Sequence, residues 1–239
     1  MILLFLFLNI EVHSKIDSLS SLLDKAPQLS TILELNRCYL KLSDFDKGIE
    51  LLKKYEKNSS WEEKPVLLFA IAEDYFFSGR LLEARKEYLL LSTKYPRADI
   101  TNDALERLYL IESVKENTAL LKRLAYALYL FHIGNFDSAE DSLKPLLKST
   151  AGVHACYYLA LLYKERGELP LALSALEESF NTSPAQKMNN ALLLYAELLI
   201  QLDKKKEAQR ILEELLVNTP SSIYAVRARR MLKQELGKE

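Results

Sequence analysis

The sequence predicts an all-α protein built as a stack of helical hairpins. The chain of 239 residues contains only 6 Gly and 7 Pro, which is few for the many turns of a sheet protein. Apolar residues recur at helical spacing along most of its length. A pattern of helix, tight turn and helix also recurs, so each hairpin is expected to pack against its neighbours.

The amino-terminal residues 1–10 form a continuous apolar block. This block is shorter than the roughly 20 residues that span a bilayer, but it fits the apolar region of a secretory signal peptide. Val12-His13-Ser14 provides a cleavage site. We therefore expect residues 1–14 to be a signal peptide and residues 15–239 to form the folded domain. The alternative is an apolar capping helix packed on the first hairpin.

The first hairpin follows a short helix expected at 16–23. Apolar spacing predicts helices over 32–42 and 45–55, with Ser43 in the turn between them. Gly48 lies near the start of the second helix, where later hairpins have alanine. Both residues are small enough to allow close contact between helices.

The second hairpin has the clearest boundaries. Ser60 and Glu63 have the spacing of a capping box, which predicts a helix from Trp61 to Tyr75. Gly79 permits the left-handed backbone that closes a helix. The second helix of this hairpin then ends at Pro96.

The remaining helices follow in order, beginning with an extra helix at 98–113. Pro145 is expected to kink or shorten the helix that contains it, and Ser183 to Gln186 have the spacing of another helix start. Three further hairpins and a last helix are expected at 120–132 with 136–147, 153–165 with 170–180, 188–202 with 205–217, and 223–236.

The small residue at the start of each second helix defines a register. These residues are Gly48, Ala84, Ala139, Ala172 and Ala208, so successive members are 36, 55, 33 and 36 positions apart. The turn position gives the same intervals at Ser43, Gly79, Gly134, Gly167 and Asp203. The long interval contains the extra helix, which predicts a possible break in the stack near residues 97–118.

The best-matched unit has a small residue, a tyrosine, a turn glycine, an alanine, an aromatic residue and a proline at Ala72, Tyr75, Gly79, Ala84, Tyr88 and Pro96. This pattern resembles the tetratricopeptide repeat. The resemblance covers about residues 30–239. It implies a right-handed α-α superhelical solenoid of about five hairpins, with one extra helix and capping helices.

Two short segments refine the resemblance. Tyr95-Pro96 followed by residues 102–105, and the closing segment 219–229, are similar to bacterial envelope tetratricopeptide proteins of the outer-membrane assembly lipoprotein and Tol–Pal coordinator types. The resemblance implies a periplasmic or secreted scaffold that binds a protein or peptide. A cytosolic adaptor and an accessory protein to an envelope enzyme or polysaccharide system are the alternatives.

In this family the first helices of the hairpins line a concave groove that binds partners. The resemblance therefore implies that partner contacts lie among the groove positions, part of which also belongs to the packed core. These candidates are Phe69, Glu73, Phe76, Phe77, Leu128, Phe131, His132, His154, Tyr157, Lys164 and Glu197.

The sequence contains no pattern typical of catalysis. It has no nucleophile elbow, P-loop or dinucleotide fingerprint. His13, His132 and His154 lack metal-ligand spacing, and a net charge of −1 with interspersed signs does not indicate nucleic-acid binding. We expect no enzymatic activity, cofactor or metal, and membrane association only through a partner.

Overall fold

The computed structural model describes residues 2–182 and 188–237, and over these ranges it is helical with no strand. The predicted all-α class is confirmed. Helices that follow one another in sequence pack together within each of two compact units, Met1–Asn135 and Phe136–Glu239. The expected break at residues 97–118 lies inside the first unit, which we call unit 1, and the second is unit 2.

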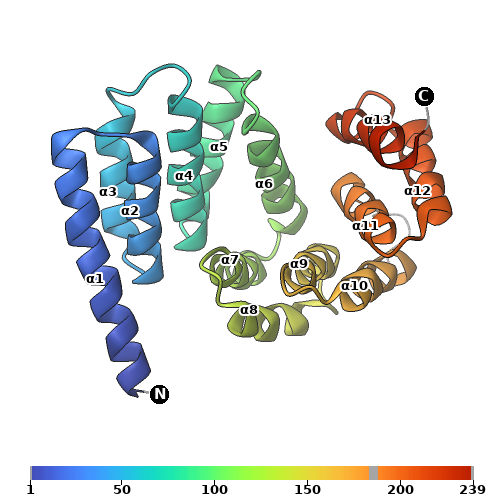
Figure 1. Cartoon of the computed structure of the whole chain (residues 1–239), viewed down its shortest axis with the longest axis horizontal. Coiled ribbons are helices and arrows are strands. Elements are labelled where there is room, and N and C mark those ends of the chain that lie inside the picture. Colours follow the sequence, from blue (N-terminus) through green and yellow to red (C-terminus); the bar gives the residue numbers. More distant parts are fainter. Residues whose placement is uncertain (1, 183–187, 238–239) are drawn as a thin grey trace. The chain divides into compact units, whose positions relative to one another are not determined.

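Most helices agree closely with the predicted ranges (Figure 1), but the helix expected at 16–23 extends over residues 2–25. Those of unit 1 are α1 (Ile2–Lys25), α2 (Leu29–Lys41), α3 (Phe45–Glu56), α4 (Lys64–Phe77), α5 (Leu81–Lys94), α6 (Thr101–Val114) and α7 (Thr118–His132). Those of unit 2 are α8 (Phe136–Leu143), the short 3-10 helix η1 (Lys144–Leu146), α9 (Gly152–Glu165), α10 (Leu169–Thr182), α11 (Asn189–Gln201), α12 (Lys205–Asn218) and α13 (Ile223–Leu236).

Two helix boundaries are explained by proline. The capping box forms, because the Ser60 N–H donates to Glu63 Oε2 at 3.1 Å and the Glu63 N–H donates to Ser60 Oγ at 3.3 Å. Residues 61–63 nevertheless form a turn, and α4 begins at Lys64 rather than Trp61, which places Pro65 in the first turn of the helix. Proline fits there because the first N–H groups of a helix have no partner within it. Pro145 shortens α8 as predicted, and the chain continues as η1. The helix start expected at Ser183 lies outside the described residues.

The predicted turn positions share a left-handed backbone. Their φ angles are 58° at Ser43, 74° at Gly79, 81° at Gly134, 76° at Gly167 and 59° at Asp203. The register was therefore right even at the two turns that lack glycine. A side chain with a Cβ is strained in this conformation, whereas glycine is not.

Asp203→Gly is expected to stabilise unit 2 by about 0.5–1 kcal/mol. The Asp203 side chain is exposed, so its removal uncovers no core, and the left-handed backbone is relieved of strain. Urea denaturation followed by helical circular dichroism measures the change. Asp203→Ala, which keeps the Cβ, is the matched control and should show no gain. Equal midpoints for the Gly and Ala variants would contradict this explanation of the turn.

In unit 1, α1 to α4 pack around a shared apolar core. The carboxyl-terminal half of α1 joins this core through Leu23, Ile16 and Leu19, and Lys15 makes an ion pair with Glu34 of α2. Helices α2 with α3 and α4 with α5 form the first two hairpins, and α6 packs on α5. The buried residues of this cluster are Leu23, Ile32, Leu35, Leu52, Leu67 and Ile71.

Helix α7 does not continue the line of α2 and α4. Its Tyr129 hydroxyl donates to the Leu40 carbonyl at 2.8 Å and lies 2.8 Å from Ser43 Oγ, so it contacts the turn that ends α2. The Tyr129 ring also packs near the ring of Phe45, at the start of α3, and near that of Phe77, at the end of α4. Figure 1 shows α7 end-on while α2 to α5 are seen from the side. Helix α7 thus crosses the turn ends of both hairpins.

In unit 2, two hairpins and a final helix enclose a second apolar core. Helix α9 pairs with α10, α11 pairs with α12, and α13 packs on α12 and α11. Ala172 and Ala208, the small residues that define the register, have no exposed surface. Such residues let neighbouring helix backbones approach closely. The core continues through Leu176, Leu198, Leu199, Leu212 and Leu215.

Candidate functional site

The structure buries the aromatic residues that were expected in the groove of α4. Phe76 is 0% exposed and Phe77 is 4% exposed, so neither ring is free to contact a partner in this structure. The physical reason is that two other helices cover them. The Arg107 guanidinium of α6 lies 5.5 Å from the centre of the Phe76 ring, and the His132 ring of α7 lies 5.1 Å from that of Phe77.

Glu73 of α4 is also buried, in an ion pair with the extra helix. Arg107 Nε donates to Glu73 Oε1 at 2.6 Å, and the terminal guanidinium nitrogen donates to Oε2 at 2.8 Å. The Tyr88 hydroxyl donates to the same carboxylate. Burial opposes ionisation of Glu73, but the charge of Arg107 and these hydrogen bonds hold its pKa below the usual range. The carboxylate therefore joins α4, α5 and α6.

The other candidates of unit 1 divide by exposure. Leu128 of α7 is buried at 1% exposure. Phe131 is half-buried and His132 is exposed, but both lie on α7 and not in the line of α2 and α4. Phe69 is half-buried and its ring lies 5.9 Å from that of Tyr88. Unit 1 therefore presents few of the expected groove side chains to solvent.

Four candidates lie on the first helices of unit 2, and two of them are in contact. Lys164 of α9 and Glu197 of α11 form an ion pair of 2.9 Å, and both side chains are partly exposed. Tyr157 lies two helical turns before Lys164, on the same side of α9, and is half-buried against Tyr158. His154, one turn before Tyr157, is buried. The first helices of unit 2 thus expose a mixed aromatic and charged face.

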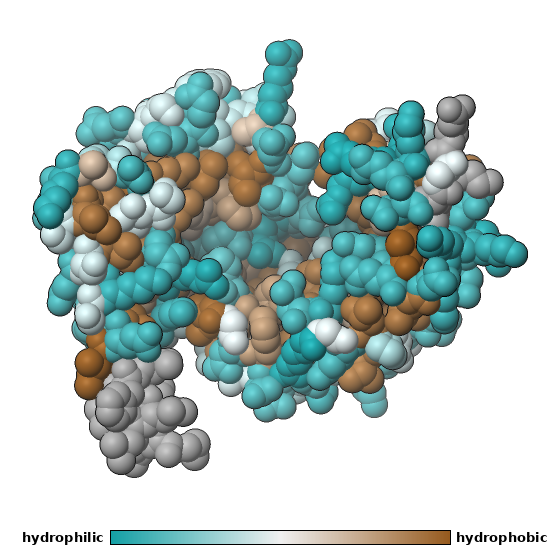
Figure 2. All heavy atoms as spheres, in the orientation of Figure 1, coloured by the Kyte–Doolittle hydropathy of each residue, from teal (hydrophilic) through white to brown (hydrophobic). Residues whose placement is uncertain are grey.

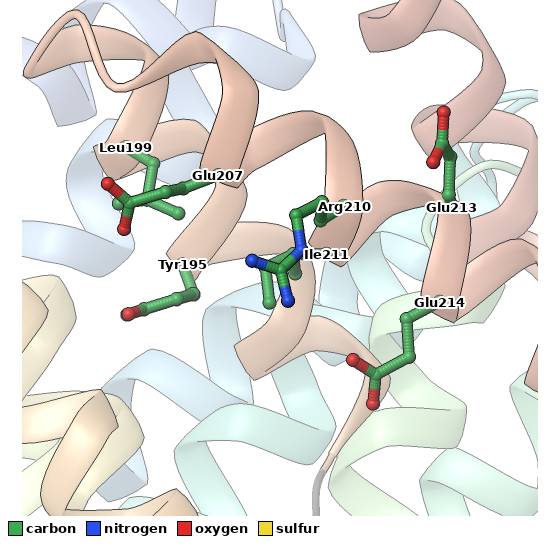
Figure 3. Close-up of a pocket in the computed structure, with 7 residues that line it drawn as sticks. All are labelled: Tyr195, Leu199, Glu207, Arg210, Ile211, Glu213 and Glu214. Atoms are coloured by element: carbon green, nitrogen blue, oxygen red, sulfur yellow. The ribbon is translucent and has the colours of Figure 1, made fainter.

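Unit 2 also has a pocket of about 420 Å³ between α11 and α12, which the sequence did not suggest (Figure 3). Tyr195, Leu199 and Ile211 contribute apolar surface, and Arg210 stands among acidic side chains. The Tyr195 hydroxyl donates to Glu177 at 2.9 Å, and burial together with that carboxylate raises its pKa. The charged residues of the lining are Glu207, Arg210, Glu213 and Glu214.

A larger pocket of about 830 Å³ lies in unit 1, between the start of α4 and the segment that follows α5. Trp61 lines it, is 67% exposed, and has its ring 4.6 Å from that of Tyr95. The capping box of Ser60 and Glu63 orders the wall of the pocket at the start of α4. In the wall formed by the segment after α5, Thr101 Oγ1 donates to the Tyr95 carbonyl at 2.6 Å. Figure 2 shows hydrophobic residues gathered over the upper part of α2 to α5. In the sequence, the single tryptophan was the only feature that pointed to this pocket.

The described residues hold no arrangement typical of a metal or redox site. No group of three or more His, Cys, Asp or Glu side chains among them could hold a metal ion. Cys38 and Cys156 are both free and buried, and burial raises the pKa of the Cys156 thiol to about 11. No helix within the described ranges has the length and hydrophobicity that crossing a membrane needs.

The fold and the exposed faces define a helical-repeat protein. Residues 190–222, which cover nearly all of α11, the whole of α12 and the turn that follows it, match the family model of the tetratricopeptide repeat. This match supports the assignment of the last hairpin to that repeat. No curated protein sequence matches the chain.

Solved structures of helical proteins are similar at low identity. The Rap conjugation gene regulator of plasmid pLS20, in complex with the Phr* peptide, is 16% identical with a TM-score of 0.45, over 88% of this chain and 61% of that one. The yeast Sti1 TPR2AB-domain complex with pHSP90 is 13% identical with a TM-score of 0.41, over 90% and 87%. BtubC (BKLC) from P. vanneervenii is 13% identical with a TM-score of 0.39, over 95% and 91%. The chain therefore spans less than two thirds of the Rap regulator.

Proposed function

We propose that this chain is a non-catalytic scaffold that binds a protein or peptide partner in the bacterial cell envelope. A tetratricopeptide-type helical-repeat fold is typical of protein-interaction scaffolds, and it supports this function. The main supporting observation is the partly exposed face of α9 and α11 in unit 2, where Tyr157, Lys164 and Glu197 combine an aromatic surface with both charges. Such a face suits a peptide that carries complementary charges.

Export is the second part of the proposal. Lys15, Ile16 and Leu19 of α1 all follow residue 14, and they contact α2 or the core of unit 1. Loss of residues 1–14 would therefore leave these contacts in place. We expect the mature protein from fractionated cells to begin at Lys15, which amino-terminal sequencing measures. An intact Met1 would contradict export and favour the cytosolic adaptor.

Lys164→Glu tests the binding face directly. The variant places two carboxylates together where the Lys164–Glu197 pair now stands, and it reverses one charge of the proposed face. Capture from an envelope extract by the immobilised chain should fall about tenfold, a change worth roughly 1.4 kcal/mol. Unchanged helical circular dichroism and melting temperature would show that the fold survives.

Lys205→Glu is the matched control, because it makes the same charge change at an exposed position at the start of α12. It should capture the partner as the unaltered chain does. Equal capture by both variants would contradict the assignment of the face. Substrate turnover that is abolished by a single point change would contradict the non-catalytic part of the proposal.

A further inference from the structure

A pair of polar side chains is buried between the first two hairpins of unit 1. Asn36 of α2 is 5% exposed and Asp74 of α4 is 1% exposed. Asn36 Nδ2 donates to Asp74 Oδ1 at 3.2 Å. The remaining oxygens, Asn36 Oδ1 and Asp74 Oδ2, have no hydrogen-bond partner among the described residues. Buried polar atoms without a partner are rare in folded proteins and need an explanation.

The two unpartnered oxygens converge on the same point of α3. A Cβ placed on Gly48 would lie 2.5 Å from Asn36 Oδ1 and 2.7 Å from Asp74 Oδ2. The oxygens therefore lie on the same side of the pair, over the glycine. Two acceptor oxygens gathered in a buried space repel each other, and a hydrogen atom between them would convert this repulsion into a hydrogen bond.

The surroundings of Asp74 disfavour its charged form. Burial raises the pKa of this carboxyl to about 8, and the negative charge of Glu73, its neighbour on α4, acts in the same direction. The hydrogen bond from Asn36 and the charge of Arg80 oppose the shift. Arg80 itself is bound to Asp46 at 2.7 Å, and α3 approaches the pair at Gly48.

We propose that Asp74 is protonated in the folded protein at neutral pH and that its Oδ2–H donates to Asn36 Oδ1. Together with the Asn36 Nδ2 bond, this closes a ring of two hydrogen bonds between a carboxylic acid and an amide. The ring joins α2 to α4 across Gly48. Loss of the proton at alkaline pH breaks one bond of the ring and leaves a buried charge.

The proposal makes unit 1 sensitive to pH in a defined direction. The carboxyl binds its proton more tightly in the folded state than in the unfolded chain, so the stabilisation is complete below about pH 4 and is lost as pH rises toward 8. Because unfolding releases one proton over this pH window, the equilibrium constant for unfolding rises about tenfold per pH unit. Above that window the contribution of Asp74 is constant.

Asp74→Asn in the full chain is the matched variant. An asparagine can form the same ring with Asn36, because its amide donates where the acid O–H donated, but it does not titrate. Urea unfolding of both proteins is measured from pH 5 to pH 9 by the fluorescence of Trp61, which is the only tryptophan and lies in unit 1. The unfolding constant of the unaltered chain relative to the variant should rise about tenfold per unit up to pH 8.

A relative unfolding constant that is flat from pH 5 to pH 8 would overturn the proposal. Infrared spectroscopy of the native protein provides a test that needs no unfolding. The C=O stretch of a neutral carboxylic acid should be present at pH 6, fade above pH 8 and be absent from the Asp74→Asn spectrum. A native spectrum without that band at pH 6 would show that Asp74 is ionised, and it would also overturn the proposal.

Discussion

Gly48→Ala should destabilise unit 1 by about 1–3 kcal/mol, against the usual effect of alanine in a helix. Helix propensity alone would favour alanine by roughly 1 kcal/mol. The new methyl group, however, would meet the Asn36 and Asp74 oxygens at 2.5 Å and 2.7 Å, and overpacking in a closed core typically costs about 1–3 kcal/mol. It also pushes apart the hydrogen-bonded pair. Urea denaturation monitored at Trp61 measures the loss.

The control is the same change in an Asn36→Ala/Asp74→Ala background. Removing both side chains leaves space over Gly48, so alanine should then be neutral or stabilising by up to about 1 kcal/mol. The difference between the two backgrounds is the coupling energy between residue 48 and the pair. A Gly48→Ala variant as stable as the unaltered chain would show that the Asn36 and Asp74 oxygens do not lie this close to Gly48.

Arg107→Met should cost unit 1 about 3–5 kcal/mol. The methionine can fill part of the space beside Phe76, but Glu73, which is 7% exposed in the unaltered chain, loses both guanidinium hydrogen bonds. A buried carboxylate without its partner is strongly destabilising. The cost should fall in acid, because protonation of Glu73 removes the unpaired charge. Urea denaturation at pH 7 and at pH 4.5 measures both effects.

The double variant Glu73→Gln/Arg107→Met tests whether stability returns when the buried charge is also removed. The glutamine carbonyl still accepts from the Tyr88 hydroxyl, and no charge remains buried. Most of the lost stability should return, since the cost of the single change comes from the unpaired charge and not from the missing ion pair. If the double variant is no more stable than Arg107→Met alone, the Glu73 carboxylate is not the source of the cost.

The sequence predicted local structure well because helix periodicity and turn residues are local. Proline positions accounted for the short α8, and the register found the left-handed turns even at Ser43 and Asp203. Gly48 was correctly interpreted as a site of close helix contact. The particular oxygens that require glycine there come from α2 and α4, and no local pattern contains that information.

The groove was harder to predict because it depends on contacts far apart in sequence. Arg107 covers Phe76 from a helix that has no equivalent in the repeat pattern. Helix α7 has the periodicity of a first helix, yet Tyr129 attaches it across the turn that ends α2. Phe76 and Phe77, which were candidates for partner contact, therefore belong to the packed part of unit 1. Lys164 and Glu197 do come together, in the part of unit 2 where two hairpins follow each other regularly.

Photo-crosslinking from the face of α9 and α11 tests whether a partner binds there. A photoreactive residue replaces Gln201, an exposed residue one helical turn after Glu197 on α11, and in a control chain it replaces the exposed Lys205 on α12. If a partner binds this face, we expect one discrete adduct in cells from position 201 that Lys164→Glu abolishes, and none from position 205. Equal adducts from both positions, or an adduct that persists in the Lys164→Glu chain, would contradict a partner-binding face on α9 and α11.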